Sequence, residues 1–250
     1  MLHTIQADFY RLFRSKGFWI TEAILILLIL AGVIFGATAH FGVNTESTLP
    51  QATEVWTGFK ALTNYSASIS MTIFFTIIIV TLVLGTDLTQ NLYKNSLAYG
   101  VSRTSYYFAK SAVILTIALF QFLVVYGFVF LLATLCNGMG VMPEHFVSHF
   151  GLTFLLQFLS TLAWVSITSF LLYASQSITL AFVGYFVGNL FLSLPALFFK
   201  DIEIFHYLNL EFQYSMVQST TAMVNTLVIA LGFILVFGFL GLATFKHKDL

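Results

Sequence analysis

Glu144, His145 and His149 are the residues whose types and spacing come closest to a chemical site in this sequence. Two histidines four positions apart share one face of a helix, and a neighbouring carboxylate adds a third metal-binding group. No further strong ligand lies nearby in the sequence. We therefore favour a solvated helix start beside Pro143 and expect no metal site.

Motifs of catalysis are not found elsewhere in the sequence. There is no GxxxxGK[ST] phosphate loop, no HExxH and no His-Asp-Ser set. Glu22 is almost the only ionisable residue in the predicted spans, and we expect it to snorkel to the inner interface, where it would reach water or a lysine. We expect no enzyme, no catalytic residue and no cofactor bound by this chain.

The elements that must position these residues are apolar helices. Hydrophobic residues make up 59% of the sequence and charged residues 8%, whereas a soluble domain carries about 25% charged residues. Several apolar runs reach the length of about 18 residues that marks a membrane-spanning helix. The sequence predicts an all-α, polytopic membrane protein.

Two further features of the sequence exclude classes of structure and function. Cys136 is the single cysteine, which excludes an internal disulfide. No basic cluster is dense enough to follow a nucleic-acid backbone, so no nucleic-acid partner is expected.

Six spans and three shorter segments are predicted within one transmembrane domain, 1–250. The first span is longer than a signal-peptide core and is expected to stay uncleaved. The segments are an amphipathic elbow helix (2–16), spans at 18–39, 66–85, 111–136, 150–172, 178–198 and 221–245, a coupling helix (87–103) and an external amphipathic segment (199–220).

The elbow helix has one apolar face. Phe9 and Phe13 lie on this face, whereas Arg11 and Arg14 lie away from it. This pattern is typical of a helix that lies along the inner leaflet with its arginines near anionic headgroups of membrane lipids. We expect a bend at Gly17 into the first span; the alternative is a plain basic flank.

Basic residues are distributed unevenly over the loops. Of the ten, eight fall on the side of the two termini and only Lys60 and Lys200 on the other. Because positively charged loops tend to stay in the cytoplasm, both termini are expected to be cytoplasmic. The eight are Arg11, Arg14, Lys16, Lys94, Arg103, Lys110, Lys246 and Lys248.

Residues 87–110, after the second span, form the longest polar passage that carries Lys and Arg. Its apolar positions indicate a short amphipathic helix that turns at Gly100 and leads into the third span. Such a helix can sit in a groove of a soluble partner. The residues assigned to this docking contact are Asp87, Asn91, Lys94, Asn95, Leu97, Tyr99, Gly100, Ser102 and Arg103.

The order of these parts resembles the permease subunits of ABC-2 type transporters. The matching passage, N-x-L-x-x-G-x-S-R-x-x-Y-x-x-x-K, runs from Asn95 to Lys110, and a lysine-rich tail follows the last span. The likeness is closest to small permeases of bacterial lantibiotic immunity and peptide-toxin export.

This resemblance implies a subunit of the bacterial plasma membrane that exports an amphipathic peptide or lipid-like substrate. It also implies a second permease, identical or related, and two cytoplasmic ABC ATPase subunits that hold ATP and Mg. The passage after the second span would be the coupling helix in a cleft of the ATPase. Spans one, two and five would line the substrate route, and 199–220 would form an outer gate helix.

Two glycine pairs have the spacing that allows close helix approach. They are Gly32 with Gly36 in the first span and Gly184 with Gly188 in the fifth. A dimer seam and ordinary packing within one chain both remain open for these pairs.

Two other function classes also remain open. An ion-coupled secondary transporter would act without an ATPase, although the scarcity of buried charge argues against it. A non-transporting scaffold or sensor subunit would leave the distribution of cargo unchanged. Four polar residues within the spans are expected to form hydrogen bonds between helices, namely Gln121, Gln157, Asn189 and Asn225.

Overall fold

A computed structural model describes residues 2–37, 55–199 and 202–247, and these are helical or irregular, with no strand among them. Six helical stretches of this part are long and apolar enough to cross a membrane. The predicted all-α, polytopic fold is confirmed. The six are α2 (Lys16–Phe35), the run Gly58–Thr89, α7 (Arg103–Asn137), α8 (Phe146–Ser175), α9 (Ile178–Phe198) and α10 (Thr220–His247).

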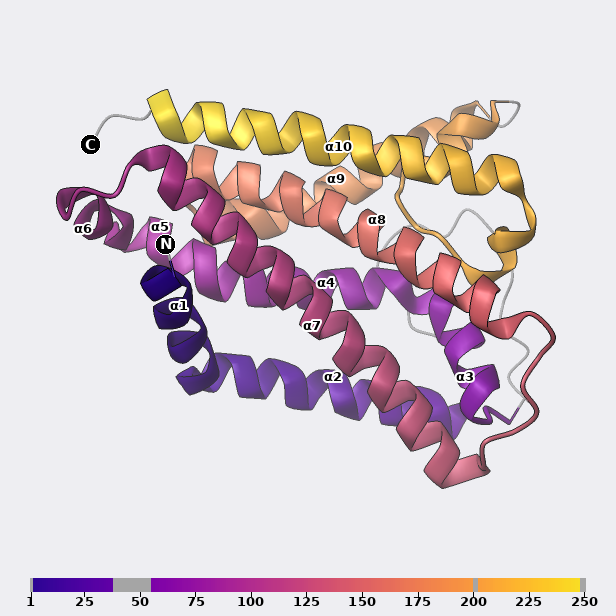
Figure 1. Ribbon diagram of the computed structural model, residues 1–250. Coiled ribbons are helices and arrows are strands. Elements are labelled where there is room, and N and C mark those ends of the chain that lie inside the picture. The colour runs from indigo at the N-terminus through magenta and orange to yellow at the C-terminus, as the bar shows by residue number, and fades with distance from the viewer. Residues whose placement is uncertain (1, 38–54, 200–201, 248–250) are drawn as a thin grey trace.

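The spans run roughly along one direction, and α7 crosses the bundle obliquely (Figure 1). Helices α8 and α10 lie side by side, and α7 contacts α1, α2, α3 and α10. We call the end of the bundle that holds α1 (Leu2–Arg14), α6 (Leu92–Ala98) and the last turn of α10 the elbow end. The opposite end holds α3 and the connection between α7 and α8.

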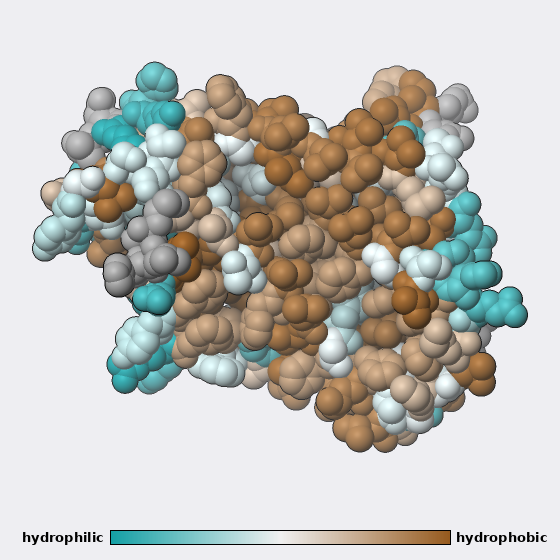
Figure 2. All heavy atoms as spheres, viewed as in Figure 1, coloured by the Kyte–Doolittle hydropathy of each residue, from teal (hydrophilic) through white to brown (hydrophobic). Residues whose placement is uncertain are grey.

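The surface of the bundle has the polarity of a membrane protein. Figure 2 shows apolar side chains over the middle of the visible face and hydrophilic residues at its two ends. Large apolar side chains of α2, α9 and α10 are exposed, among them Leu27, Phe191 and Phe239 at 63%, 64% and 72%. The protein is therefore a multi-pass membrane protein whose outer helices face lipid or another membrane protein.

The second span is longer than the predicted 66–85 and changes its helical form along its length. It comprises α3 (Gly58–Tyr65), a 3-10 turn (Ser66–Ser68), α4 (Ile69–Val80), a π-helical turn (Thr81–Gly85) and α5 (Thr86–Thr89). Threonine hydroxyls near the π-turn bond back to the preceding turn, which tends to bend a helix. Thr86 Oγ1 donates to the Leu82 carbonyl at 2.7 Å and Thr89 Oγ1 to the Gly85 carbonyl at 2.8 Å.

The bend between elbow and first span falls at Ser15 rather than at the predicted Gly17. Ser15 is extended, with φ −72° and ψ 124°, and separates α1 from α2. Trp19 Nε1 donates to the Phe13 carbonyl at 2.8 Å, which satisfies a backbone group at the end of α1. Helix α2 then ends at Phe35, short of the predicted 39, because Gly36 adopts the left-handed conformation at φ 60°.

The remaining spans differ from prediction mainly at their capped ends. Helix α7 begins at Arg103 rather than 111, because the Ser102 hydroxyl accepts a hydrogen bond from the Ser105 amide and caps the helix. Helix α8 extends the predicted 150–172 at both ends, and α10 extends 221–245 by a residue or two. Helix α9 has the predicted bounds.

Residues 199–220 do not form the predicted helix in the part that the structure describes. They contain two 3-10 turns, Glu203–Tyr207 and Tyr214–Gln218, and Leu210 between them has a left-handed φ of 60°. The segment folds onto α8, where Leu210 and Phe212 are fully buried. The prediction of a helix was wrong, because side chains of α8 satisfy the backbone here in place of helical hydrogen bonds.

Gln157 of α8 makes three of the hydrogen bonds in this region. Its Nε2 donates to the carbonyls of Ser66 at 2.8 Å and Phe212 at 2.6 Å, and its Oε1 accepts from the Tyr126 hydroxyl. The bonds join α8 to the 3-10 turn of the second span, to α7 and to the 199–220 segment. The prediction that Gln157 forms hydrogen bonds between elements is confirmed.

Glu211, in the same segment, makes the free energy of unfolding depend on pH. Burial raises the pKa of its carboxyl from 4.5 to about 7, so the folded chain binds more protons than the unfolded chain between these two values. Stability must then fall as pH rises through this range, by at most about 3 kcal/mol. We expect Glu211→Gln to remove this fall in pH-dependent thermal unfolding curves, and the exposed control Glu144→Gln to retain it.

Candidate docking and coupling site

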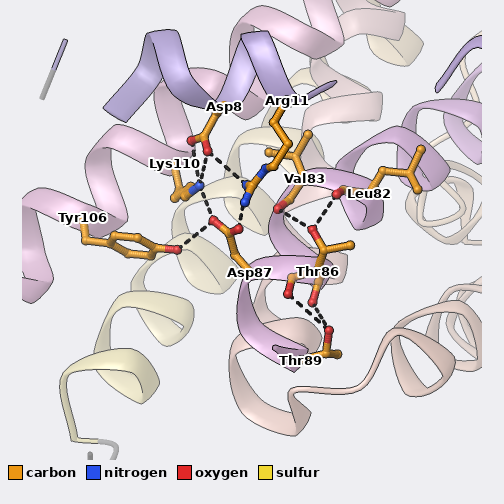
Figure 3. Close-up of polar contacts among 10 residues, drawn as sticks. Asp8, Arg11, Leu82, Val83, Thr86, Asp87, Thr89, Tyr106 and Lys110 are labelled. Carbon is orange, nitrogen blue, oxygen red and sulfur yellow. Dashed lines mark hydrogen bonds and ion pairs between the residues drawn. The ribbon is translucent and has the colours of Figure 1, made fainter. Parts of the chain in front are cut away.

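Four charged residues from three elements meet at the elbow end, and we call them the charge cluster. They are Asp8 and Arg11 of α1, Asp87 of α5 and Lys110 of α7 (Figure 3). Lys110 Nζ lies 2.7 and 2.6 Å from the two Asp8 oxygens and also pairs with Asp87. Arg11 Nη2 lies 2.6 Å from Asp87 Oδ1 and 3.1 Å from Asp8 Oδ1.

The charge cluster is largely buried. The side chains of Lys110, Asp87 and Asp8 are 2%, 6% and 7% exposed, whereas that of Arg11 is 44% exposed. Two carboxylates face two cations, so the charges balance, and the Tyr106 hydroxyl donates to Asp87 Oδ2 at 3.2 Å. Buried charges persist only when they are paired and hydrogen-bonded. The cluster therefore fixes α1, α5 and α7 to one another.

The charge cluster is not predicted from the sequence. Asp8 lies one helical turn before Leu12, on the face of α1 that is buried, but no motif in the sequence marks it. Lys110 was placed in a polar passage, but it lies about two turns inside α7. The Asp87 carboxylate, predicted to contact a partner, is enclosed by the cluster in this structure; its contact with a partner stays a prediction.

The exposed part of the predicted docking passage is α6 and the turn that follows it. Tyr99 at the tip of this turn is 90% exposed, and Gly100 takes the left-handed φ of 87° that the turn requires. Leu97 is half-buried beneath them. We call the exposed set the docking face: Asn91, Lys94, Asn95, Tyr99, Gly100 and Ser102.

Helix α6 is anchored from below by Tyr93. This side chain is 5% exposed and packs edge-on against Phe245 of α10, with ring centroids 5.8 Å apart. Its hydroxyl accepts a hydrogen bond from Gln176 Nε2 at 3.1 Å, in the turn between α8 and α9. The docking face therefore rests on the ends of three spans.

Arg103, assigned to the docking contact, has a different position in the structure. Its Nη1 donates to the carbonyl of Lys246 at 2.7 Å and approaches that of Phe245 at 3.4 Å. These carbonyls belong to the last turn of α10, where the helix dipole favours a cation. Arg103 thus connects α7 to α10 instead of reaching outward.

The elbow residues divide between two roles. Arg14 is exposed and bonds to the Tyr10 hydroxyl at 2.7 Å, whereas Arg11, expected near headgroups, turns into the charge cluster. Phe13 packs edge-on against Phe18 and Phe120, with centroids 5.4 and 6.3 Å apart. Phe9 is half-buried against the cluster of apolar residues around Leu12.

The glycine pair of the fifth span packs within the chain. A Cβ on Gly184 would lie 2.3 Å from Leu171 Cδ1 of α8, and one on Gly188 would lie 3.4 Å from Trp164. This face of α9 is therefore covered within the chain, which favours ordinary packing over a dimer seam for this pair. In the first span, Gly36 ends the helix, and the Gly32 carbonyl accepts from the Ala37 amide at 3.1 Å.

We expect Gly184→Leu to destabilise the folded chain by about 1–3 kcal/mol through overpacking against α8. Gly127→Leu is the matched control, because a Cβ there meets nothing within 4 Å. Thermal unfolding of the purified variants measures the difference. Equal stability of the two variants, with loss of dimer in Gly184→Leu alone, would restore the dimer assignment.

Glu144, His145 and His149, where no metal site is expected, lie at the start of α8. The rings of His145 and His149 are 6.1 Å apart, and among the residues that the structure describes no group of three or more His, Cys, Asp or Glu side chains is placed to hold a metal ion.

Six apolar spans, an amphipathic helix α1 beside the first span and an anchored helix α6 exposed at the elbow end define a multi-pass membrane protein with a surface for a partner at that end. The family model of the ABC-2 family transporter proteins matches residues 4–190, which include most of the elbow, the charge cluster and the docking face. The chain belongs to this family. It is a non-catalytic permease subunit of an ABC transporter, and such permeases partner with ABC ATPase subunits and usually with a second permease. No curated protein matches the chain significantly in sequence.

Proposed function

We propose that this permease subunit exports an amphipathic peptide, of the antimicrobial or lantibiotic kind, from a bacterial cell. Energy comes from a separate ATPase that binds the docking face. The observation that carries the proposal is Tyr99, a large side chain 90% exposed at the tip of a short helix that is itself firmly anchored. An exposed aromatic on a rigid support is the kind of residue that dominates protein interfaces.

The charge cluster gives the docking face a mechanical connection to the spans. Asp87 lies five residues before α6 begins, at the end of the second span, and is held to α1 and α7 through Arg11 and Lys110. A push on α6 is therefore passed to the elbow and to two spans together, as a rigid-body movement. A cavity of about 220 Å³ beside the docking face, lined by Arg11, Gln90 and Leu92 among others, offers room for a partner's side chain.

The topology of the proposal places the elbow end in the cytoplasm. In the predicted topology eight of the ten basic residues fall on the side of the two termini, which supports cytoplasmic termini in the bacterial plasma membrane. ATP and Mg bind in the ATPase subunits, because this sequence has no phosphate loop. A second permease, identical or related, completes the transporter and leaves the substrate route between the two.

The apolar surfaces of the protein support an amphipathic cargo. The chain has 29 phenylalanines, and the outer faces of α2 and α9 are mostly exposed. Such surfaces suit a substrate with a large apolar side and few fixed polar contacts.

Reconstitution with the partner ATPase tests this function. Proteoliposomes that contain both subunits and a fluorescent lantibiotic are expected to move the peptide only when ATP is supplied on the side of the docking face. Movement without the ATPase but with an ion gradient would favour a secondary transporter. No movement, with intact ATPase binding, would favour a scaffold or sensor subunit.

A further inference from the structure

Glu22 of α2 and Gln121 of α7 place two buried polar side chains between these helices. Glu22 is 6% exposed and Gln121 is fully buried. Glu22 shares the inward face of α2 with Phe18 and Leu25, one turn before and one turn after it. The expectation that Glu22 snorkels to the interface is therefore wrong: its side chain points toward α7 instead of water.

Neither side chain has a partner elsewhere. The Gln121 amide lies close enough to act on the Glu22 carboxyl, yet the side-chain oxygen and nitrogen atoms of both residues lack a hydrogen bond of good geometry. Among the described residues, no charged group acts on the Glu22 carboxyl. In water such a carboxyl is ionised, but a bare buried charge is too costly to persist.

The charged groups of the neighbouring elements are engaged elsewhere or exposed. Helix α4 carries none. Lys16 on α2 and Arg14 on α1 are exposed, while the remaining charges of α1 and the lysine of α7 belong to the charge cluster. Lys110 and Gln121 are eleven positions apart on α7, about 16 Å along the helix. Within the part of the chain that the structure describes, no cation is therefore in place to neutralise Glu22.

We propose that Glu22 and Gln121 form a proton-binding site within the membrane. Glu22 takes a proton from water, and the resulting neutral carboxyl donates its O–H to Gln121 Oε1 while its carbonyl oxygen accepts from Gln121 Nε2. This pair of hydrogen bonds gives the polar atoms of both side chains a partner. The bound ligand is a proton, which needs no cavity. The carboxyl–amide pair is then a polar contact between the first and third spans.

The site links the packing of the first span to protonation. When the proton leaves, the charged Glu22 carboxylate has no cation to pair with between α2 and α7. It is then drawn toward water at the elbow end, because α2 begins there, six residues before Glu22. The contact between α2 and α7 is therefore strongest when the proton is bound. This property does not depend on the ATPase or on the identity of the cargo.

Infrared difference spectroscopy of the purified full chain tests the site. In a Glu211→Gln background, which removes another carboxyl, whose pKa burial raises to about 7, we expect the protein at neutral pH to show the C=O stretch of a protonated carboxyl. This band disappears when Glu22→Gln, an isosteric and permanently neutral change, is added. The exposed control Glu144→Gln keeps the band. An unchanged protonated-carboxyl spectrum in Glu22→Gln, together with loss of a carboxylate band, would overturn the proposal.

A second variant gives an independent answer if Glu22→Gln does not fold. In Gln121→Leu the acid loses its amide partner, so we expect the protonated band to remain and to shift to higher frequency. A spectrum identical to wild type in Gln121→Leu would show that the amide does not bind the acid and would also overturn the proposal.

Discussion

Replacing Lys110 with methionine is expected to destabilise the folded chain by about 3–5 kcal/mol, because it removes one partner from a buried ion pair. The carboxylates of Asp8 and Asp87 would then share only Arg11, which is 44% exposed. One buried negative charge would be left without compensation. Thermal unfolding of the detergent-purified protein, and the yield of monodisperse protein, measure the loss.

Two further variants distinguish the loss of the charge cluster from a general effect of a lysine substitution on stability. Lys94→Met changes an exposed residue of the docking face and is expected to alter stability by no more than about 0.5 kcal/mol. Adding Asp8→Asn to Lys110→Met restores the balance of charge and is expected to recover part of the loss. Wild-type stability in Lys110→Met would contradict a structural role for the cluster.

Replacing Tyr99 with glutamate is expected to weaken binding of the ATPase about 30-fold or more, the effect of losing an interface residue worth at least 2 kcal/mol. The side chain makes little contact within the chain, since it is 90% exposed. The spans should therefore insert and unfold as in wild type. Affinity for the ATPase, together with the ATPase rate in the complex, measures the effect.

Val141→Glu is the matched control for Tyr99→Glu. Val141 is 91% exposed in the connection between α7 and α8, at the opposite end of the bundle. It receives the same charge at the same exposure but should leave ATPase binding unchanged. If both variants bound the ATPase equally well, the docking face would lie elsewhere.

The spans were predictable because lipid imposes a length and a composition on each of them. Helix α9, with an uncharged sequence between Ser177 and Phe199, has the predicted bounds. The ends of other helices depend on local caps. Ser102 before an apolar run is such a signal, and it marks the start of the third span that the prediction placed at 111.

The charge cluster could not be predicted in the same way. Asp87 and Lys110 occur in a polar passage that has the composition of a solvated loop, and their burial depends on Asp8, 102 positions before Lys110. The prediction of a helix at 199–220 was wrong for a related reason. Its backbone follows acceptors and donors on α8, such as the Trp164 indole that donates to the Asn209 carbonyl at 3.3 Å, and no local pattern encodes these contacts.

The claim that an ATPase drives this permease from the cytoplasm through the docking face is tested most directly at position 99. In a Cys136→Ala background, which removes the exposed native cysteine, Tyr99→Cys is treated with a membrane-impermeant maleimide. We predict labelling in inside-out vesicles, protection of this cysteine when the ATPase is bound, and no labelling in intact cells. Labelling of intact cells would contradict both the cytoplasmic orientation of the elbow end and the binding of the ATPase at the docking face.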